Sequence, residues 1–162
     1  MTEKAENRKC IVAVRVRGSI SAQREAKETL DMLHLNRTNN AVLIDNRPSF
    51  LGMLKRVQAY ATWGEATKET VVLMLKERAL LAGDKKLTDE YIQKIGYKTV
   101  DELADAIMSC KVEHGKLPNM RPLFRLHPPT KGYKGKTKKS YNAGGEAGYR
   151  GEKISELVKR MV

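Results

Sequence analysis

The sequence predicts an α+β fold in which a small β-α-β-α-β unit comes first and helices follow it. Within the first 63 residues, β-branched runs alternate with apolar residues at helical spacing. From residue 67 to about residue 115 the apolar residues keep a helical spacing. A basic, glycine-rich stretch and a last amphipathic segment complete the chain. This order is typical of a small sheet with two helices on one face, a split β-α-β arrangement.

The run CIVAVRV, residues 10–16, is the strongest strand signal in the chain. It ends at Arg17-Gly18, where the chain turns. Side chains alternate between the two faces of a strand. The run therefore places Val12, Val14 and Val16 on one face and Ile11, Ala13 and Arg15 on the other.

The other elements of the first unit follow from cap, turn and proline signals. Ser21 is a suitable N-cap for a helix that ends near His34. A polar turn then leads into a second strand at 41–45, and Pro48 stands in the first turn of a second helix, where its missing N–H costs nothing. A third strand is expected around 60–63.

Three helices are expected in the middle of the chain. The first opens at Thr67 and closes at Gly83, and the second is a short helix from Thr88 to Gly96. The third begins with a capping box, Thr99 and Glu102, and ends at His114. Four regions result: a core domain at 1–63, a helical extension at 64–115, a basic extended loop at 116–151 and a C-terminal helix at 152–162 that packs on the domain.

The positive charge of the chain is concentrated at its C-terminal end. The net charge is +12, of which residues 116–162 carry +9, from 12 basic and 3 acidic side chains. Residues 63–115 carry a net −2. We infer a near-neutral scaffold that presents two basic regions, one in residues 1–62 and one after residue 116.

The basic loop predicts nucleic-acid binding. It carries nine lysines or arginines against one acid, Glu146, and holds three of the six tyrosines. Lysines neutralise phosphates and tyrosines stack on exposed bases. Its apolar content is too low for independent folding, so we expect residues 131–151 to be disordered until RNA binds. The alternative is a solvated surface loop. The candidate contacts here are Lys131, Tyr133, Lys134, Lys136, Lys138, Lys139, Tyr141 and Arg150.

The segment RPLFRLHPP, residues 121–129, is a stiff extended stretch because of its three prolines. Arg121 and Arg125 suit bidentate phosphate contacts, and His127 lies beside them. In the other interpretation the apolar residues of the segment pack it on the domain and the arginines point outward. The two interpretations do not exclude each other.

Catalysis and metal binding have little support in the sequence. His127 with Glu146 is the only pair we weigh for an enzyme, and His127 has no neighbouring Ser, Cys or carboxylate that suggests a triad. Cys10 and Cys110 lack the spacing of a zinc site. We therefore expect no cofactor, no metal and no small-molecule substrate.

Neither a leader nor a membrane segment is recognisable. The first nine residues lack an apolar run, and no stretch of about 18 apolar residues occurs anywhere. We expect a cytoplasmic protein with two reduced thiols.

Four blocks of this chain resemble a known family. They are IVAVRVRG at 11–18, LNRTNNAVLIDNRPSFLGMLKRV at 35–57, FRLHPPTKGYKG at 124–135 and GGEAGYRGEKI at 144–154. In these blocks the chain is similar to the archaeal form of large-subunit ribosomal protein L-thirty, over nearly its whole length. The nine residues ahead of Cys10 contain two acids, whereas the eukaryotic form has a long basic extension there, which also favours an archaeal origin.

The resemblance implies a ferredoxin-like core with an antiparallel sheet, bound to large-subunit rRNA and to other ribosomal proteins, and no enzymatic activity. Two other functions stay open, a non-ribosomal RNA chaperone or regulator and a nucleic-acid-processing enzyme. RNA contacts carried over from the family to the first unit are Arg15, Arg17, Arg37, Arg47, Lys55 and Arg56.

Overall fold

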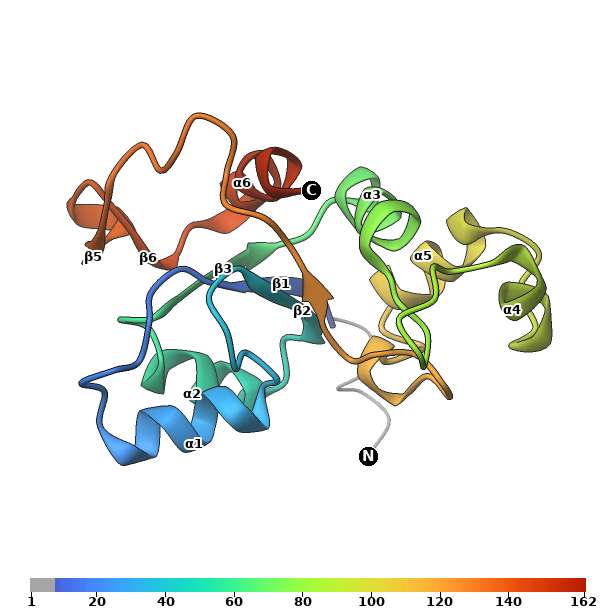
Figure 1. Cartoon of the computed structure of the whole chain (residues 1–162), viewed down its shortest axis with the longest axis horizontal. Coiled ribbons are helices and arrows are strands. Elements are labelled where there is room, and N and C mark those ends of the chain that lie inside the picture. Colours follow the sequence, from blue (N-terminus) through green and yellow to red (C-terminus); the bar gives the residue numbers. More distant parts are fainter. Residues whose placement is uncertain (1–7) are drawn as a thin grey trace.

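A six-stranded sheet runs through the molecule and is covered by helices on both faces (Figure 1). The computed structural model describes residues 8–162. The strand order is β4-β2-β1-β3-β6-β5, so the first strand of the chain lies near the centre. We expected neither a leader nor a long basic extension ahead of Cys10. Residues 1–7, to which these expectations mainly apply, lie outside the described part of the chain. Within that part, no helix has the length and apolar character needed to cross a bilayer.

The first unit has the predicted order β-α-β-α-β, and the predicted α+β class is confirmed. Strand β1 pairs antiparallel with both β2 and β3, so it is the middle strand of the unit. Helices α1 and α2 lie together under one face of the sheet (Figure 1). The elements are β1 Cys10–Arg15, α1 Arg24–Met32, β2 Asn40–Asp45, α2 Pro48–Arg56 and β3 Ala61–Glu65.

The rest of the chain adds helices on the opposite face and three further strands. The helices are α3 Lys68–Arg78, α4 Asp89–Lys94, α5 Val100–Met108 and α6 Ile154–Met161, and the strands are β4 Phe124–Arg125, β5 Lys136–Ser140 and β6 Gly145–Tyr149. Short 3-10 turns are η1 His114–Lys116, η2 Tyr141–Ala143 and η3 Gly151–Lys153.

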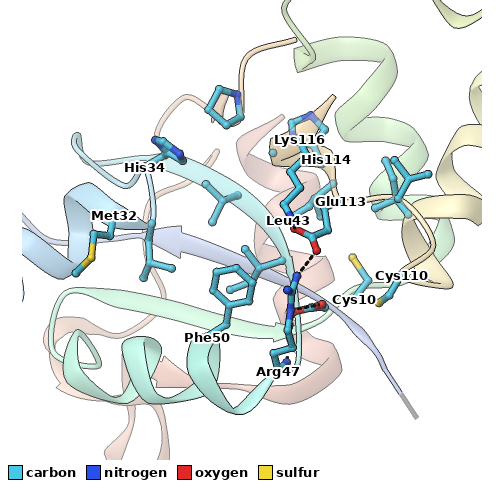
Figure 2. A pocket seen from close by; sticks show the side chains of 18 residues that line it. Cys10, Met32, His34, Leu43, Arg47, Phe50, Cys110, Glu113, His114 and Lys116 are labelled. Carbon is cyan, nitrogen blue, oxygen red and sulfur yellow. Dashed lines mark hydrogen bonds and ion pairs between the residues drawn. The ribbon is translucent and has the colours of Figure 1, made fainter. Parts of the chain in front are cut away.

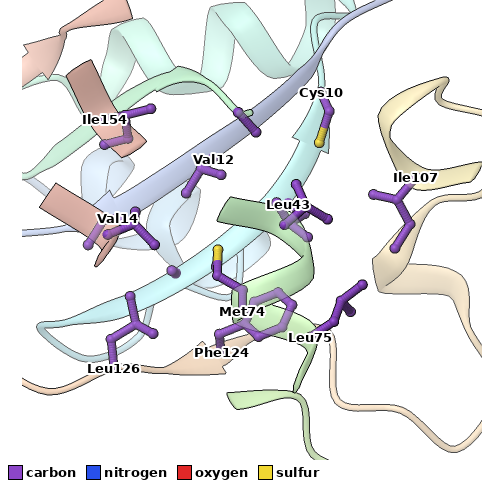
Figure 3. Close-up of a cluster of buried hydrophobic side chains, with 14 of the residues drawn as sticks. Cys10, Val12, Val14, Leu43, Met74, Leu75, Ile107, Phe124, Leu126 and Ile154 are labelled. Carbon is purple, nitrogen blue, oxygen red and sulfur yellow. The ribbon is translucent and has the colours of Figure 1, made fainter. Parts of the chain in front are cut away.

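Strand β1 is buried on both faces, which makes it the link between two hydrophobic clusters. As predicted, Ile11 and Ala13 face one way and pack with α1 and α2. Val12 and Val14 face the other way. The second cluster also contains Leu43 of β2, residues of α3, α5 and α6, and the segment around Phe124 (Figure 3). The two layers of helices therefore depend on one sheet between them.

The helix after Thr67 is shorter than the sequence predicts. We expected it to reach Gly83, but α3 ends at Arg78, and Ala79 is already extended. Leu80 and Leu81 instead form isolated bridges, to Lys86 and Met120. Backbone pairing with later segments therefore outweighs helix propensity in this stretch. Half of the expected capping box of α5 is present, because Thr99 accepts a hydrogen bond from the Glu102 N–H, whereas the Glu102 carboxylate accepts from the Lys98 N–H and not from Thr99.

The basic segment is more ordered than its composition predicts. We expected residues 131–151 to be disordered without RNA, but β5 and β6 extend the sheet beyond β3. The pairs β3–β6 and β5–β6 are parallel, so the complete sheet is mixed although the first unit is antiparallel. Composition could not indicate this, because the segment contributes backbone pairing rather than apolar side chains.

Gly64 is the position at which β3 has no room for a side chain. A Cβ at this residue would lie 1.9 Å from the Gly151 carbonyl oxygen, which belongs to the turn after β6. Gly52 in α2 has nothing within 4 Å of the corresponding point. The close approach at Gly64 allows the C-terminal segment to pack against the central strands.

We predict opposite effects for alanine at these two glycines. Gly64→Ala should lower the free energy of unfolding by about 2 kcal/mol or more, because backbone atoms have to move. Gly52→Ala should raise it by about 0.5–1 kcal/mol, because glycine is unfavourable inside a helix. Urea unfolding of both variants checks this. Equal stability of the wild type and Gly64→Ala would show that β6 is not held closely against β3.

His114 is a buried base at the edge of the second cluster. Its ring stacks on Phe124 with the centroids 4.5 Å apart. Burial, the larger effect, lowers the pKa of His114 from 6.5 to about 4, and the Pro122 backbone opposes this. The folded protein therefore keeps His114 neutral at pH values where the unfolded chain protonates it.

This difference predicts a pH dependence of stability. Because the folded pKa is below the unfolded value, the stability that His114 contributes is complete above pH 6.5 and is lost as the pH falls toward 4. At pH 5 the loss should be about 2 kcal/mol relative to pH 7.5. The measurement is urea unfolding of the wild type and His114→Phe at both pH values, since carboxylates shared by the two proteins cancel in the difference. Parallel pH profiles would contradict the assignment.

Candidate nucleic-acid interface

The outermost strand of the sheet carries a row of exposed lysines. Strand β5 pairs only with β6, so its other edge is open. Its lysines and those just before it are all exposed. None of them forms an ion pair with another residue of the described chain. We call this set the lysine edge: Lys131, Lys134, Lys136, Lys138 and Lys139.

Glycines allow β5 and β6 to lie close together. A Cβ at Gly145 would be 2.0 Å from the Lys139 carbonyl oxygen, and one at Gly135 would be 2.6 Å from the Gly144 oxygen. Gly144 has a φ of 81°, which suits the turn between the two strands. The glycines that made the segment look flexible in sequence are therefore used for close strand packing.

A buried ion pair fixes the lysine edge to the rest of the sheet. The Arg150 guanidinium donates to the Glu146 carboxylate at 2.5 Å and to the Thr62 hydroxyl of β3 at 2.8 Å. The other Glu146 oxygen accepts from the Gly135 N–H at 2.8 Å. Both charged side chains are 5% exposed. One pair thus connects β3, β6 and the residue just before β5.

The loop that leads into β5 is fastened to α6. The His127 and Thr130 N–H groups donate to the carbonyl oxygens of Met161 and Arg160. In return, the Arg160 guanidinium donates to the Gly132 carbonyl at 2.8 Å. The loop therefore arches over the end of α6 and returns to the sheet at β5 (Figure 1).

The candidate tyrosines are placed in different ways. Tyr133 is half-buried and donates to the Asn39 side chain at 3.2 Å. Tyr141 is half-buried under the Arg150 guanidinium, 4.9 Å from its ring centroid. Tyr149, which we did not include among the candidate contacts, is 53% exposed. The tyrosines predicted to stack on bases are thus partly engaged within the protein.

Part of the first basic region lies at the same end of the sheet as the start of β5. Arg17 follows β1, Arg37 precedes β2 and Arg56 ends α2 just before β3. Strand β1 is antiparallel to β2 and β3, so these positions share one end of the unit. The register of β6 with β3 brings Lys136 to that end as well. Arg37 and Arg56 are exposed, and Arg17 lies 5.6 Å above the Tyr60 ring.

Arg15, a predicted contact, is buried. Its guanidinium donates to the carbonyl oxygens of Arg17, Leu35 and Asn36. Burial lowers the pKa of Arg15, and Asp31 partly offsets this. We therefore assign Arg15, like Arg150, to holding the fold and leave both out of the proposed interface.

Arg47 lies at the opposite end of the unit, where β2 ends. Figure 2 shows it beside a cavity of about 180 Å³, reaching toward Glu113. Arg47 bonds to Asp45 at 2.7 Å and to the Glu113 carboxylate, and the Asp45 bond is the main cause that raises its pKa. Glu113 also pairs with Lys116 at 3.0 Å. The charge of Arg47 is thus already neutralised within the protein.

The arginines of the 121–129 segment share one acid. Arg121 lies 2.9 Å from Asp84 and Arg125 lies 3.7 Å from it. Phe124 between them is fully buried. His127 is half-buried, with Nδ1 2.8 Å from the Pro128 oxygen. The segment therefore packs on the domain through Phe124, while phosphate contacts of its arginines stay a prediction.

The family model "Ribosomal protein L30p/L7e" matches residues 11–61. Two proteins named large ribosomal subunit protein uL30 are each 44% identical to the chain. The one from Thermofilum pendens aligns over 93% of this chain and 97% of its own length, and the one from Methanopyrus kandleri over 91% and 100%.

The chain belongs to the ribosomal protein L30p/L7e family.

The family model and the relatives cover different parts of the structure. The model spans β1, α1, β2 and α2 and ends where β3 begins. The relatives extend through the C-terminal third, as does a uL30 protein from Archaeoglobus fulgidus that is 44% identical over 149 residues. The lysine edge thus lies outside the segment matched by the family model and within the length shared with archaeal members of the family.

Two basic residues near the lysine edge were missed by the sequence interpretation. Lys153 and Arg160 lie at the two ends of α6, on the side of Lys134 and Tyr141. We had interpreted this helix only as an apolar anchor. Lys153 directly precedes the helix, and Lys159 and Arg160 lie between its buried positions near its end. This pattern of basic residues among apolar ones was the signal in the sequence that could have identified them.

We predict that substitutions of Glu146 and Arg150 have non-additive effects on stability, because the two side chains form a buried ion pair. Glu146→Gln should destabilise the fold by about 3–5 kcal/mol, because it leaves a buried guanidinium without its counter-ion. Adding Arg150→Met should recover most of that loss, because no buried charge remains. Thermal and urea unfolding of the single and double variants provide the measurement. If the two losses simply add, the pair is not a coupled buried contact.

Proposed function

We propose that this protein is a structural constituent of the large ribosomal subunit that binds large-subunit rRNA through the lysine edge. The proposed contacts also include Arg17, Arg37 and Arg56 at the adjoining end of the sheet, with Lys55 and His127 at its margin. Membership of a family whose curated members are named as large-subunit proteins supports the ribosomal part. The proposal places the protein with the ribosomes.

The observation that carries the RNA part is the difference between paired and unpaired cations. Arg47 and Arg121 have acidic partners, and Arg15 and Arg150 are buried. The five lysines of the edge have no acidic partner in the described chain and are exposed. Unpaired cations on an open edge are available to phosphates, whereas paired ones would first have to give up a partner.

Binding of this kind requires no chemical step. Each lysine that meets a phosphate releases a condensed counter-ion from the RNA, and this entropy gain drives association. The sheet already fixes the backbone that carries the lysines, so binding has to order their side chains but not the strand. The protein would therefore fasten RNA segments and stabilise their arrangement.

The enzyme alternative loses the carboxylate that it paired with His127. It required a Glu146 carboxylate free to work with His127, but both carboxylate oxygens accept bonds from Gly135 and Arg150. Among residues 8–162, no three His, Cys, Asp or Glu side chains are grouped as metal ligands. A non-ribosomal RNA chaperone stays an alternative, since it would use the same lysine edge.

Other large-subunit proteins are the second class of partner that we propose. The helices α3 to α5 belong to the near-neutral part of the chain and lie on the far side of the molecule from β5 (Figure 1). That separation leaves this side available for protein contacts while the lysine edge meets RNA.

The test is sedimentation of a native cell extract on a gradient at increasing salt. The wild-type protein should migrate with the large subunit and persist through a high-salt wash. Lys136→Ala, Lys138→Ala and Lys139→Ala together should release it at lower salt, and in binding assays should reduce the slope of log K against log salt by roughly 2–3. A wild-type protein found at the top of the gradient would overturn the ribosomal proposal.

A matched control removes the same charge elsewhere. Lys85→Ala, Lys86→Ala and Lys94→Ala are three exposed positions between α3 and the end of α4. This variant should keep the wild-type salt dependence. Equal release of both triple variants would mean that net charge, and not the lysine edge, governs the association.

A further inference from the structure

A groove separates the β5–β6 turn from α6, and the proposed function does not yet use it. Its volume is about 520 Å³, within the range of about 300–1,000 Å³ that is typical of small-ligand sites. One wall is the backbone of Gly135, Gly144 and Gly145, and α6 forms the other. The Gly135 and Gly144 N–H groups already donate to Glu146 and to the Tyr141 carbonyl, so a ligand here would be held by side chains.

The charges around the groove favour one anionic group. Glu146 and Arg150 in its floor neutralise each other. Lys134 and Lys153 are exposed on opposite sides, and Arg160 completes the cations at the end of α6. Of the two acids that line the groove, only Glu156 has no ion pair among the described residues. The excess of cations over acids suits a phosphodiester.

An aromatic ring with a fixed orientation also lines the groove. Tyr141 is held by the Arg150 guanidinium on one face, and Arg150 is itself held by Glu146 and Thr62. A ring that is already fixed loses little freedom when a base stacks on it. Aromatic side chains are the usual platforms for unstacked RNA bases.

We propose that this groove binds a single unstacked nucleotide of the RNA, with its base against Tyr141 and its phosphate between Lys134 and Lys153. This inference rests on the proposed function, because the lysine edge next to the groove would bring the RNA to it. A paired base in a duplex has its faces covered by its neighbours, so only a looped-out or single-stranded nucleotide fits.

The experiment compares two RNA probes with the full-length protein. One is a single-stranded oligouridine of ten nucleotides, and the other is a blunt RNA duplex of sixteen base pairs. Tyr141→Leu should weaken binding of the single strand by about tenfold or more, the usual effect of losing one stacked base. It should leave duplex binding unchanged, because the lysine edge remains. Tyr141→Phe keeps the ring and should bind the single strand like the wild type.

Two controls separate the possible causes. Tyr97→Leu changes a tyrosine that packs against the cluster beside α3 and α5, and it should change neither affinity. The salt dependence should stay the same in Tyr141→Leu, because stacking releases no counter-ions. Ultraviolet cross-linking of the oligouridine followed by mass spectrometry should place the modified peptide within residues 134–153.

The outcomes distinguish this inference from the proposed function. If the wild type binds neither probe, RNA binding itself is refuted. If it binds both and Tyr141→Leu weakens both equally, Tyr141 only supports the strands and the nucleotide site is refuted. Competition by free adenosine monophosphate as effective as that by the oligouridine would also overturn it, since the groove would then hold a free nucleotide.

Discussion

The fold depends on a sheet whose central strand is apolar on both faces. Helices α1 and α2 cover Ile11 and Ala13, which leaves Val12 and Val14 to be covered by something else. Helices α3, α5 and α6 provide that cover, although they follow much later in the chain. The first unit is therefore only half of a folded structure, and the C-terminal part serves as its second layer. An RNA-binding surface in that part is therefore held in place by the same hydrophobic core.

Patterns with a local cause could be predicted from the sequence. The alternation of β1, the proline that begins α2 and the Thr99 cap of α5 all depend on residues within a few positions of one another. The strands β5 and β6 could not be predicted in this way. Their pairing depends on backbone contacts at Gly64 and Gly145 and on a buried ion pair, whose partners become neighbours only when distant segments meet.

In the candidate interface, too, some features could be predicted from the sequence and others depend on contacts between distant segments. Composition locates the basic segment, since charge can be counted along a chain. It could not separate Lys138 from Arg150, because the difference between them is a partner. Arg150 and Arg15 have donors satisfied inside the protein, and Arg47 and Arg121 have nearby acids. A sequence gives the number of cations, but their availability to RNA depends on which of them the fold has already paired.

The parallel pairing of β6 with β3 has a consequence for the time at which the protein becomes competent to bind. The Thr62 hydroxyl donates to Gly148, 86 positions further along the chain, and α6 follows within a few residues of that contact. A polypeptide leaving its own ribosome therefore cannot set the lysines in register until β6 has also left the ribosome. Chains that lack α6 would carry the same lysines but would not hold them in the folded sheet. They would therefore compete poorly with the folded protein for the same RNA.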